Sequence, residues 1–194
     1  YDRFELHELL GRGGFSTVYR GLDPTGQEVA IKLFSGDVVE NRVSLGRFFR
    51  EVATLRNVDS PGIVPVLGSG FAQGRFYIAM KLILGLSAGE LLHEFGPFEI
   101  EEACRLGRDV ANALHKLSQH GLVHRDVKPA NIMIQPEGQC VLVDFGLAKG
   151  HEDISITSSG ELIGTGPYLA PEVIRGPGAD SLASDLYSLG ATVY

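Results

Sequence analysis

The chain has 194 residues, of which 44% are hydrophobic and 21% charged, so it can bury a sizeable core and does not have a disordered composition. Its 17 basic and 24 acidic residues give a net charge of −7, which argues against nucleic acid and anionic membrane surfaces as partners. Neither a signal peptide nor a long uncharged apolar run is apparent, so no membrane contact is expected within this segment.

The first 80 residues or so read mainly as short strands and turns. A glycine-rich stretch lies between the strand-like residues 4–10 and 18–21, and glycines allow backbone N–H groups to approach phosphate oxygens closely. No long helical pattern follows, which disfavours a dinucleotide-binding turn. Taken alone, the stretch is better interpreted as a plain hairpin turn. The residues in question are Gly11, Arg12, Gly13, Gly14, Phe15, Ser16 and Val18.

Two further strands are predicted at residues 29–32 and 76–80, with one helix between them at residues 44–57. Lys32 closes the first of these strands, and Glu51 lies on the helix. By themselves, both would be interpreted as ordinary solvated charges. A functional role for Lys32 and Glu51 is favoured only by the motifs further along the chain.

Beyond Leu84 the pattern becomes helical. Ser87 and Glu90 have the spacing of a capping box ahead of a short helix, and residues 101–120 form a clear amphipathic helix. Two short strands follow at 132–134 and 140–143. The Ser- and Thr-rich residues 150–165 show no periodicity, and a segment of that length is typical of a functional loop.

Two cysteines occur in the chain, Cys104 in the helical pattern and Cys140 in a strand pattern. Both are interpreted as buried structural thiols rather than as a disulfide. Reduced cysteines suit a cytoplasmic location.

The most informative segment is His-Arg-Asp-Val-Lys-Pro-Ala-Asn at residues 124–131, followed thirteen residues after its last position by Asp144-Phe145-Gly146. It places two carboxylates, an amide and an ammonium at a spacing suited to holding a metal-bound triphosphate and deprotonating a hydroxyl. Together with the glycine-rich stretch, the strand ending at Lys32 and the segments at 164–172 and 184–190, it resembles the protein kinases. The resemblance is strongest to bacterial eukaryotic-like serine/threonine protein kinases.

This resemblance implies an α+β, two-lobed kinase fold. Residues 1–84 would form a small antiparallel β-sheet lobe with one helix, and residues 85–194 a mainly helical lobe that is truncated. The implied activity is ATP-dependent transfer of the γ-phosphate to serine or threonine hydroxyls of protein substrates. The implied cofactors are ATP and Mg²⁺, with Mn²⁺ as an alternative ion.

The resemblance also assigns roles within the catalytic segment. Asp126 would accept the hydroxyl proton, and Lys128 would stabilise charge on the transferred group. Asn131 and Asp144 would bind the metal ion. His124 would pack beneath Phe145 rather than act as a base.

Nucleotide contacts are implied on both sides of the expected lobe boundary. Lys32, paired with Glu51, would reach the α- and β-phosphates beneath the glycine-rich stretch. The adenine would be held by side chains and by the backbone of a hinge. The residues implied are Val18, Ala30, Met80 and Met133, with Lys81 and Ile83 in the hinge.

Control by phosphorylation is implied by Arg125, because an arginine at this place in kinases pairs with a phosphorylated residue of the activation segment. Thr157 and Ser159 are the candidate phosphorylation sites, and a homodimer could carry out the autophosphorylation. Thr165 belongs to the stretch that receives the acceptor residue. With Lys128 it matches the serine/threonine pattern.

The sequence ends inside the helix that begins near Ser184, whose Asp185 is expected to bind the backbone of the catalytic segment. Kinase domains continue beyond this point, and the arginine that would pair with Glu172 is missing. A fragment of a longer kinase is therefore expected, with a membrane span allowed elsewhere in the parent and with the activity of this chain alone left open. The alternatives are a pseudokinase-like binding module and a small-molecule phosphotransferase, the latter disfavoured by the Ala-Pro-Glu motif.

Overall fold

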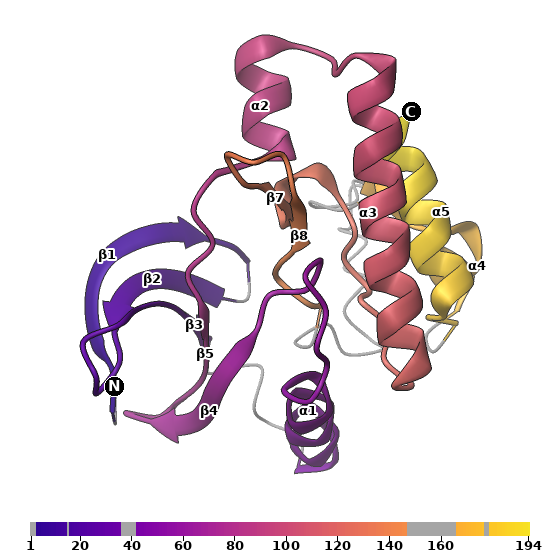
Figure 1. Cartoon of the computed structure of the whole chain (residues 1–194). Coiled ribbons are helices and arrows are strands. Elements are labelled where there is room, and N and C mark those ends of the chain that lie inside the picture. The colour runs from indigo at the N-terminus through magenta and orange to yellow at the C-terminus, as the bar shows by residue number, and fades with distance from the viewer. Residues whose placement is uncertain (1–2, 15, 36–41, 147–165, 177–178) are drawn as a thin grey trace. The chain divides into compact units, whose positions relative to one another are not determined.

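The computed structural model describes residues 3–14, 16–35, 42–146, 166–176 and 179–194 (Figure 1). The chain divides into two compact units, Tyr1–Asp59 with Val64–Ile83 and Ser60–Ile63 with Leu84–Tyr194. Within the described part, no helix combines the length and the apolar character that crossing a bilayer requires.

The first unit is an antiparallel sheet with one helix, as predicted. Its strand order is β1-β2-β3-β5-β4. The helix predicted at residues 44–57 is confirmed and begins two residues earlier. The elements are β1 (Glu5–Arg12), β2 (Ser16–Leu22), β3 (Glu28–Phe34), α1 (Arg42–Leu55), β4 (Val66–Ala72) and β5 (Arg75–Lys81).

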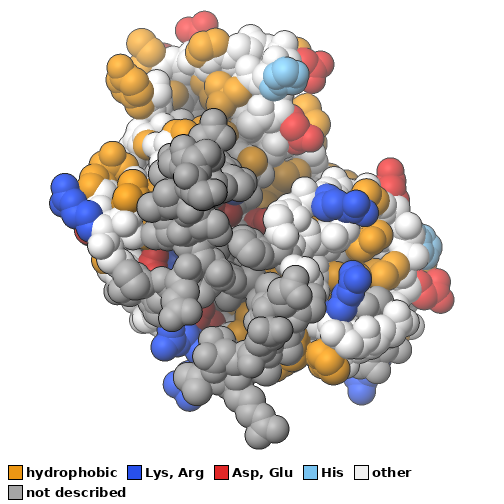
Figure 2. Space-filling model, turned by 180° about the vertical axis from the view of Figure 1, so that it is seen from behind, with side chains coloured by type: hydrophobic (Ala, Val, Ile, Leu, Met, Phe, Trp, Pro, Cys, Tyr) orange, Lys and Arg blue, Asp and Glu red, His pale blue; other side chains and the backbone are white. Residues whose placement is uncertain are grey.

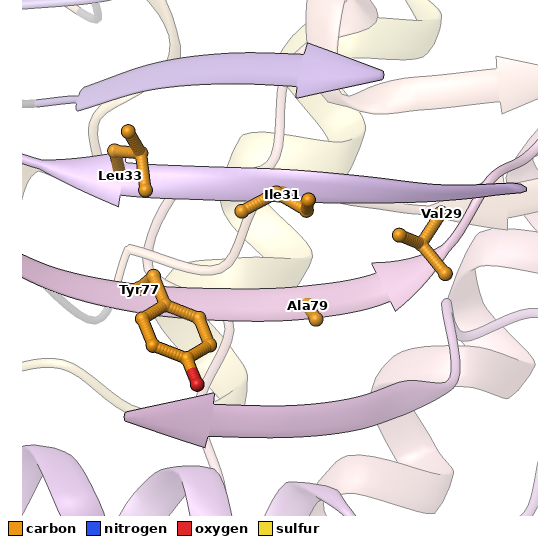
Figure 3. Packing of buried hydrophobic residues seen from close by; sticks show 5 residues of the cluster. All are labelled: Val29, Ile31, Leu33, Tyr77 and Ala79. Carbon is orange, nitrogen blue, oxygen red and sulfur yellow. The ribbon is translucent and has the colours of Figure 1, made fainter. Parts of the chain in front are cut away.

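The core on one face of this sheet follows from the two-residue period of strand β3. Val29, Ile31 and Leu33 point to the same side and are at most 5% exposed. They pack beside Tyr77 and Ala79 of β5 (Figure 3). The intervening β3 residues, including Lys32, therefore belong to the opposite face.

The pairing of β1 with β2 requires a glycine at position 21. A Cβ added to Gly21 would lie 2.1 Å from the carbonyl oxygen of Glu5 and 2.7 Å from Cδ1 of Ile31. Backbone of a paired strand cannot move aside cheaply, so we expect Gly21→Ala to lower the free energy of unfolding by about 3 kcal/mol. Urea denaturation measures this change.

The matched control is Gly46→Ala on α1, where an added Cβ meets no atom within 4 Å. Alanine favours a helix interior over glycine by about 1 kcal/mol, so this variant should gain stability. Equal stability of the Gly21→Ala and wild-type proteins would contradict the close packing described.

The second unit combines helices with a small sheet ordered β6-β7-β8. Its longest helix, α3, packs against α5. The elements are β6 (Leu86–Ser87), α2 (Ala88–Phe95), α3 (Ile100–Gln119), η2 (Pro129–Asn131), β7 (Ile132–Ile134), β8 (Cys140–Leu142), η3 (Gly166–Tyr168), α4 (Pro171–Arg175) and α5 (Leu182–Val193).

The short segment Ser60–Ile63 belongs to this second unit, although the expected lobe division placed it in the first. The reason is backbone pairing with β8. The Leu142 N–H donates to the Gly62 carbonyl at 2.8 Å, and Ile63 forms a parallel bridge with Leu142.

The predicted capping box at the start of α2 is confirmed. The Glu90 N–H donates to Ser87 Oγ at 3.1 Å, and the Ser87 N–H donates to Glu90 Oε2 at 2.7 Å. The Ser87 N–H and hydroxyl both donate to Glu90 Oε2 at 2.7 Å and hold the pKa of the Glu90 carboxyl below its usual value. The amphipathic helix predicted at 101–120 is confirmed within one residue at each end.

The prediction for the two cysteines is right for one and wrong for the other. Cys140 is buried, and burial raises the pKa of its thiol to about 11, as suits an unreactive structural thiol. Cys104 is exposed, because it lies outside the buried stripe of α3. That stripe consists of Leu106, Val110, Ala113, Leu114 and Leu117. Glu172 was expected to be a buried charge without its arginine partner, but it is exposed.

The surface drawn in Figure 2 carries its described Lys and Arg side chains scattered among hydrophobic and acidic ones. Proteins that bind nucleic acid gather these cations into one patch or stripe. This face therefore adds nothing in favour of a nucleic acid partner.

Candidate active site

The loop between α3 and β7 contains residues 124–131 and is called the catalytic loop. Its residue Asp126 is 8% exposed. Lys128 Nζ lies 3.0 Å from Asp126 Oδ2. Asn131 Nδ2 donates to the same oxygen at 2.8 Å and to the Asp126 backbone carbonyl at 2.8 Å. Two donors on one oxygen fix the orientation of the carboxylate.

The β7–β8 hairpin brings Asp144 to the same end of the sheet as Asn131. The register pairs Ile132 with Leu142, and the Val143 N–H donates to the Asn131 carbonyl at 3.0 Å. Asp144 therefore follows directly after the residue opposite Asn131. Its φ of 62° lies in the left-handed region, a conformation that costs energy for a residue with a side chain and is retained mainly at functional sites.

His124 is fully buried and has a structural role, as predicted. Its ring centroid lies 4.8 Å from that of Phe145. Its Nδ1 accepts the N–H of Asp126 at 3.3 Å, while Nε2 lies 3.2 Å from the Val143 carbonyl. With Nδ1 as an acceptor, Nε2 is the ring nitrogen suited to donate to the Val143 carbonyl, and the ring links residues 124–126 to the strand that leads to Asp144.

Helix α5 holds the start of the catalytic loop through the carboxylate of Asp185, which confirms the expectation from the sequence. Asp185 Oδ2 accepts the His124 N–H at 2.7 Å, and Oδ1 accepts the Arg125 N–H at 2.9 Å. Arg125 has a φ of 66°, and its Nε lies 4.0 Å from Oδ2 of Asp180. Burial raises the pKa of Asp185 to about 6. The strained residue beside Asp126 is thus held by a buried carboxylate.

In the first unit, Lys32 is 8% exposed and Glu51 lies half-buried on α1. The register pairs Val18 with Lys32 and Ala30 with Met80. Opposite residues on paired strands point to the same side of a sheet. Four of the side chains predicted to contact nucleotide therefore share one face of this sheet.

The glycine-rich stretch forms the β1–β2 hairpin rather than a strand–turn–helix. Gly11 pairs with Val18, and the Gly13 N–H donates to the Ser16 carbonyl at 2.8 Å. A Cβ at Gly11 or Gly14 would meet no atom within 4 Å, so open space lies beside the backbone here.

The remaining predicted residues fall in several places. The Lys81 N–H donates to the Pro65 carbonyl at 2.9 Å, so this donor of the expected hinge is already engaged. Ile83 ends the first unit, and Met133 lies half-buried on β7 of the second. Outside the described residues lie Phe15, Thr157, Ser159 and Thr165.

One residue beside Lys32 was not singled out from the sequence. Phe34 follows Lys32 by two positions on β3, and Lys32 Nζ lies 5.3 Å from the centroid of its ring. The strand alternation could have revealed this neighbour, because residues two apart on a strand share a face.

Comparison with known proteins agrees with this geometry. A model of the protein kinase domain family matches residues 4–194. The serine/threonine-protein kinase PknB of Mycolicibacterium smegmatis is 38% identical over 200 residues, covering 100% of this chain and 32% of the relative. The serine/threonine-protein kinase PknD of Mycobacterium tuberculosis is 36% identical over 194 residues, covering 100% of this chain and 29% of the relative.

A crystal structure of Rad53 residues 1–466 in complex with AMP-PNP matches with a TM-score of 0.79 and 28% identity, covering 99% of this chain and 47% of that one. The chain spans about a third of the length of the two mycobacterial relatives that it matches. With the family model matching nearly every residue and the catalytic loop assembled around Asp126, the chain belongs to the protein kinase domain family.

Proposed function

We propose that this chain is the catalytic part of an ATP-dependent protein serine/threonine kinase. The observation that carries the proposal is the Asp126 carboxylate, oriented by the Lys128 ammonium at 3.0 Å and the Asn131 amide at 2.8 Å. The names of the mycobacterial relatives support the serine/threonine class. The AMP-PNP bound to Rad53 supports ATP as the nucleotide.

In this proposal, bound ATP supplies the γ-phosphoryl group. Asp126 accepts the proton of the acceptor hydroxyl and aims its oxygen at that group. Lys128, whose ammonium adjoins Asp126 Oδ2, places positive charge where the phosphoryl oxygens pass. Lys32, with Glu51 on α1, holds the α- and β-phosphates.

The residues present also fit a hard metal ion. Both hydrogens of Asn131 Nδ2 go to Asp126, which leaves the amide oxygen as the atom suited to a metal, and Asp144 adds a carboxylate. Among the described residues, no group of three or more His, Cys, Asp or Glu side chains could hold a metal by itself. Mg²⁺ characteristically binds to one or two protein oxygens plus phosphates and waters, so we propose Mg²⁺, with Mn²⁺ as a substitute.

We further propose that the adenine of ATP is held by the side chains of Val18, Ala30, Met80 and Met133 and by the hinge backbone at Lys81 and Ile83. We also propose that Arg125 binds a phosphate on Thr157 or Ser159 of the activation segment. Protein substrates with serine or threonine acceptors would be the partners. A second copy of the chain would act in autophosphorylation. We place the reaction in the cytoplasm, where ATP is available.

The test is incubation of the purified chain with casein, Mg²⁺ and ATP, with phosphorylated residues mapped by peptide mass spectrometry. We expect phosphoserine and phosphothreonine that require both ATP and the divalent ion, and about a thousandfold slower transfer with the Asp126→Asn variant. Transfer by Asp126→Asn at a rate within tenfold of the wild type, or nucleotide binding with no transfer even in a chain extended past Tyr194, would overturn the proposal. The second result would favour a binding module.

A further inference from the structure

The ammonium of Lys32 lies against an aromatic ring inside the first unit. Lys32 and Phe34 are two residues apart on β3, so both side chains extend from the same face of the sheet. Nζ lies 5.3 Å from the Phe34 ring centroid, and the two residues are 8% and 1% exposed. Attraction between a cation and a ring is strongest where water is excluded, as it is here.

The same ring contacts the helix that carries Glu51. The ring of Phe48 lies 5.2 Å from that of Phe34 at an interplanar angle of 85°, the edge-to-face geometry that aromatic pairs prefer. Phe48 precedes Glu51 by three residues, so the two lie on neighbouring positions of one helix face. Phe34 therefore contacts the lysine directly and the glutamate's helix through Phe48.

We propose that Phe34 is a positioning residue for phosphoryl transfer, whose ring holds the Lys32 ammonium and, through Phe48, fixes α1 against β3. The inference rests on the proposed function, in which Lys32 binds the nucleotide phosphates. A lysine side chain is long and flexible, and a ring beside its ammonium restricts it before the nucleotide arrives. The affinity for nucleotide should then depend on the electron density of the Phe34 ring face and not only on the volume of the ring.

Stepwise fluorination of Phe34 separates these two contributions. Replacing Phe34 with mono-, di- and trifluorophenylalanine withdraws electron density from the ring face while nearly preserving its shape. We expect the Kd for AMP-PNP with Mg²⁺, measured by calorimetry, to rise with each added fluorine, by about three- to tenfold over the series. The acylation rate of Lys32 by an amine-reactive reagent should rise in parallel with the Kd. This rate is measured in the nucleotide-free chain by peptide mass spectrometry.

The matched control is the same series at Phe76, which is 7% exposed and contacts Phe48 with ring centroids 6.1 Å apart. Fluorination there alters ring–ring contacts of the same cluster but not the ring beside Lys32. Both readouts should stay flat. A Phe34 series that is as flat as the Phe76 series would overturn the proposal, since a purely structural ring would behave in that way.

Lys32→Met distinguishes this inference from the proposed function on which it rests. If Lys32→Met weakens AMP-PNP binding and the Phe34 series is flat, the inference fails while the role of Lys32 stands. If Lys32→Met binds AMP-PNP as the wild type does, the proposed role of Lys32 fails and the inference fails with it. Weakening by both changes is the expected result.

Discussion

Replacing Asp126 with asparagine should lower the rate of phosphoryl transfer by about a thousandfold while the protein stays folded. The substitution keeps the shape of the side chain but removes the base that accepts the hydroxyl proton. The amide oxygen can still accept from Lys128 and Asn131, which now contact Asp126 Oδ2 at 3.0 and 2.8 Å. Single-turnover kinetics with Mg²⁺ and ATP measures the loss.

The effect should fall on kcat rather than on nucleotide binding, because no nucleotide contact is assigned to Asp126. The Kd for AMP-PNP and the urea midpoint of Asp126→Asn should therefore stay close to those of the wild type. A transfer rate within tenfold of the wild type would remove Asp126 from the catalytic role. A collapse of stability would show instead that the carboxylate is mainly structural.

Asp185→Asn should reduce transfer by about tenfold to a hundredfold, although Asp185 is remote from the phosphate groups in the proposed mechanism. The carboxylate accepts two backbone N–H groups, from His124 at 2.7 Å and from Arg125 at 2.9 Å. An asparagine offers one oxygen, so one buried N–H loses its acceptor. Fewer hydrogen bonds then stabilise the Arg125 backbone at its φ of 66°, so we expect the position of the adjoining Asp126 to change. Asp180→Asn is the control, because Asp180 Oδ2 lies 4.0 Å from Nε of the Arg125 side chain.

The same variant should change how stability depends on pH. Burial raises the pKa of Asp185 from 3.8 to about 6, so the folded state binds the proton more tightly than the unfolded chain does. The stabilisation from this group is fully present below pH 4 and is lost as the pH rises through about 6. Because asparagine does not titrate, the unfolding free energy of the wild type minus that of Asp185→Asn should fall by on the order of 3 kcal/mol between those limits. Urea denaturation at several pH values measures it, and a constant difference would contradict the assignment.

The fold class and the kinase family were accessible from the sequence because both are indicated by local patterns. The residue order from His124 to Asn131 and the triplet at Asp144 allow few other interpretations. Hydrophobic periodicity predicted α1 and α3 within two residues at each end. The capping box at Ser87 needs only residues three apart, and it was predicted correctly for the same reason.

Contacts between distant segments were beyond the reach of such patterns. Ser60–Ile63 belongs to the second unit because Ile63 pairs with Leu142, about 80 residues further along the chain. The contact of the Phe48 ring on α1 with the Phe34 ring on β3 became evident only in the tertiary structure.

The sequence by itself determined which groups the proposed chemistry would use: a carboxylate, an ammonium, an amide, a second carboxylate and a glycine-rich turn, in the order of a protein kinase. The tertiary structure decided how those groups are held. Two donors orient Asp126, the buried Asp185 holds a strained Arg125 backbone, and an aromatic ring lies beside Lys32. The physical reason is that side-chain type is a local property, whereas orientation and burial arise from packing between elements far apart in the chain.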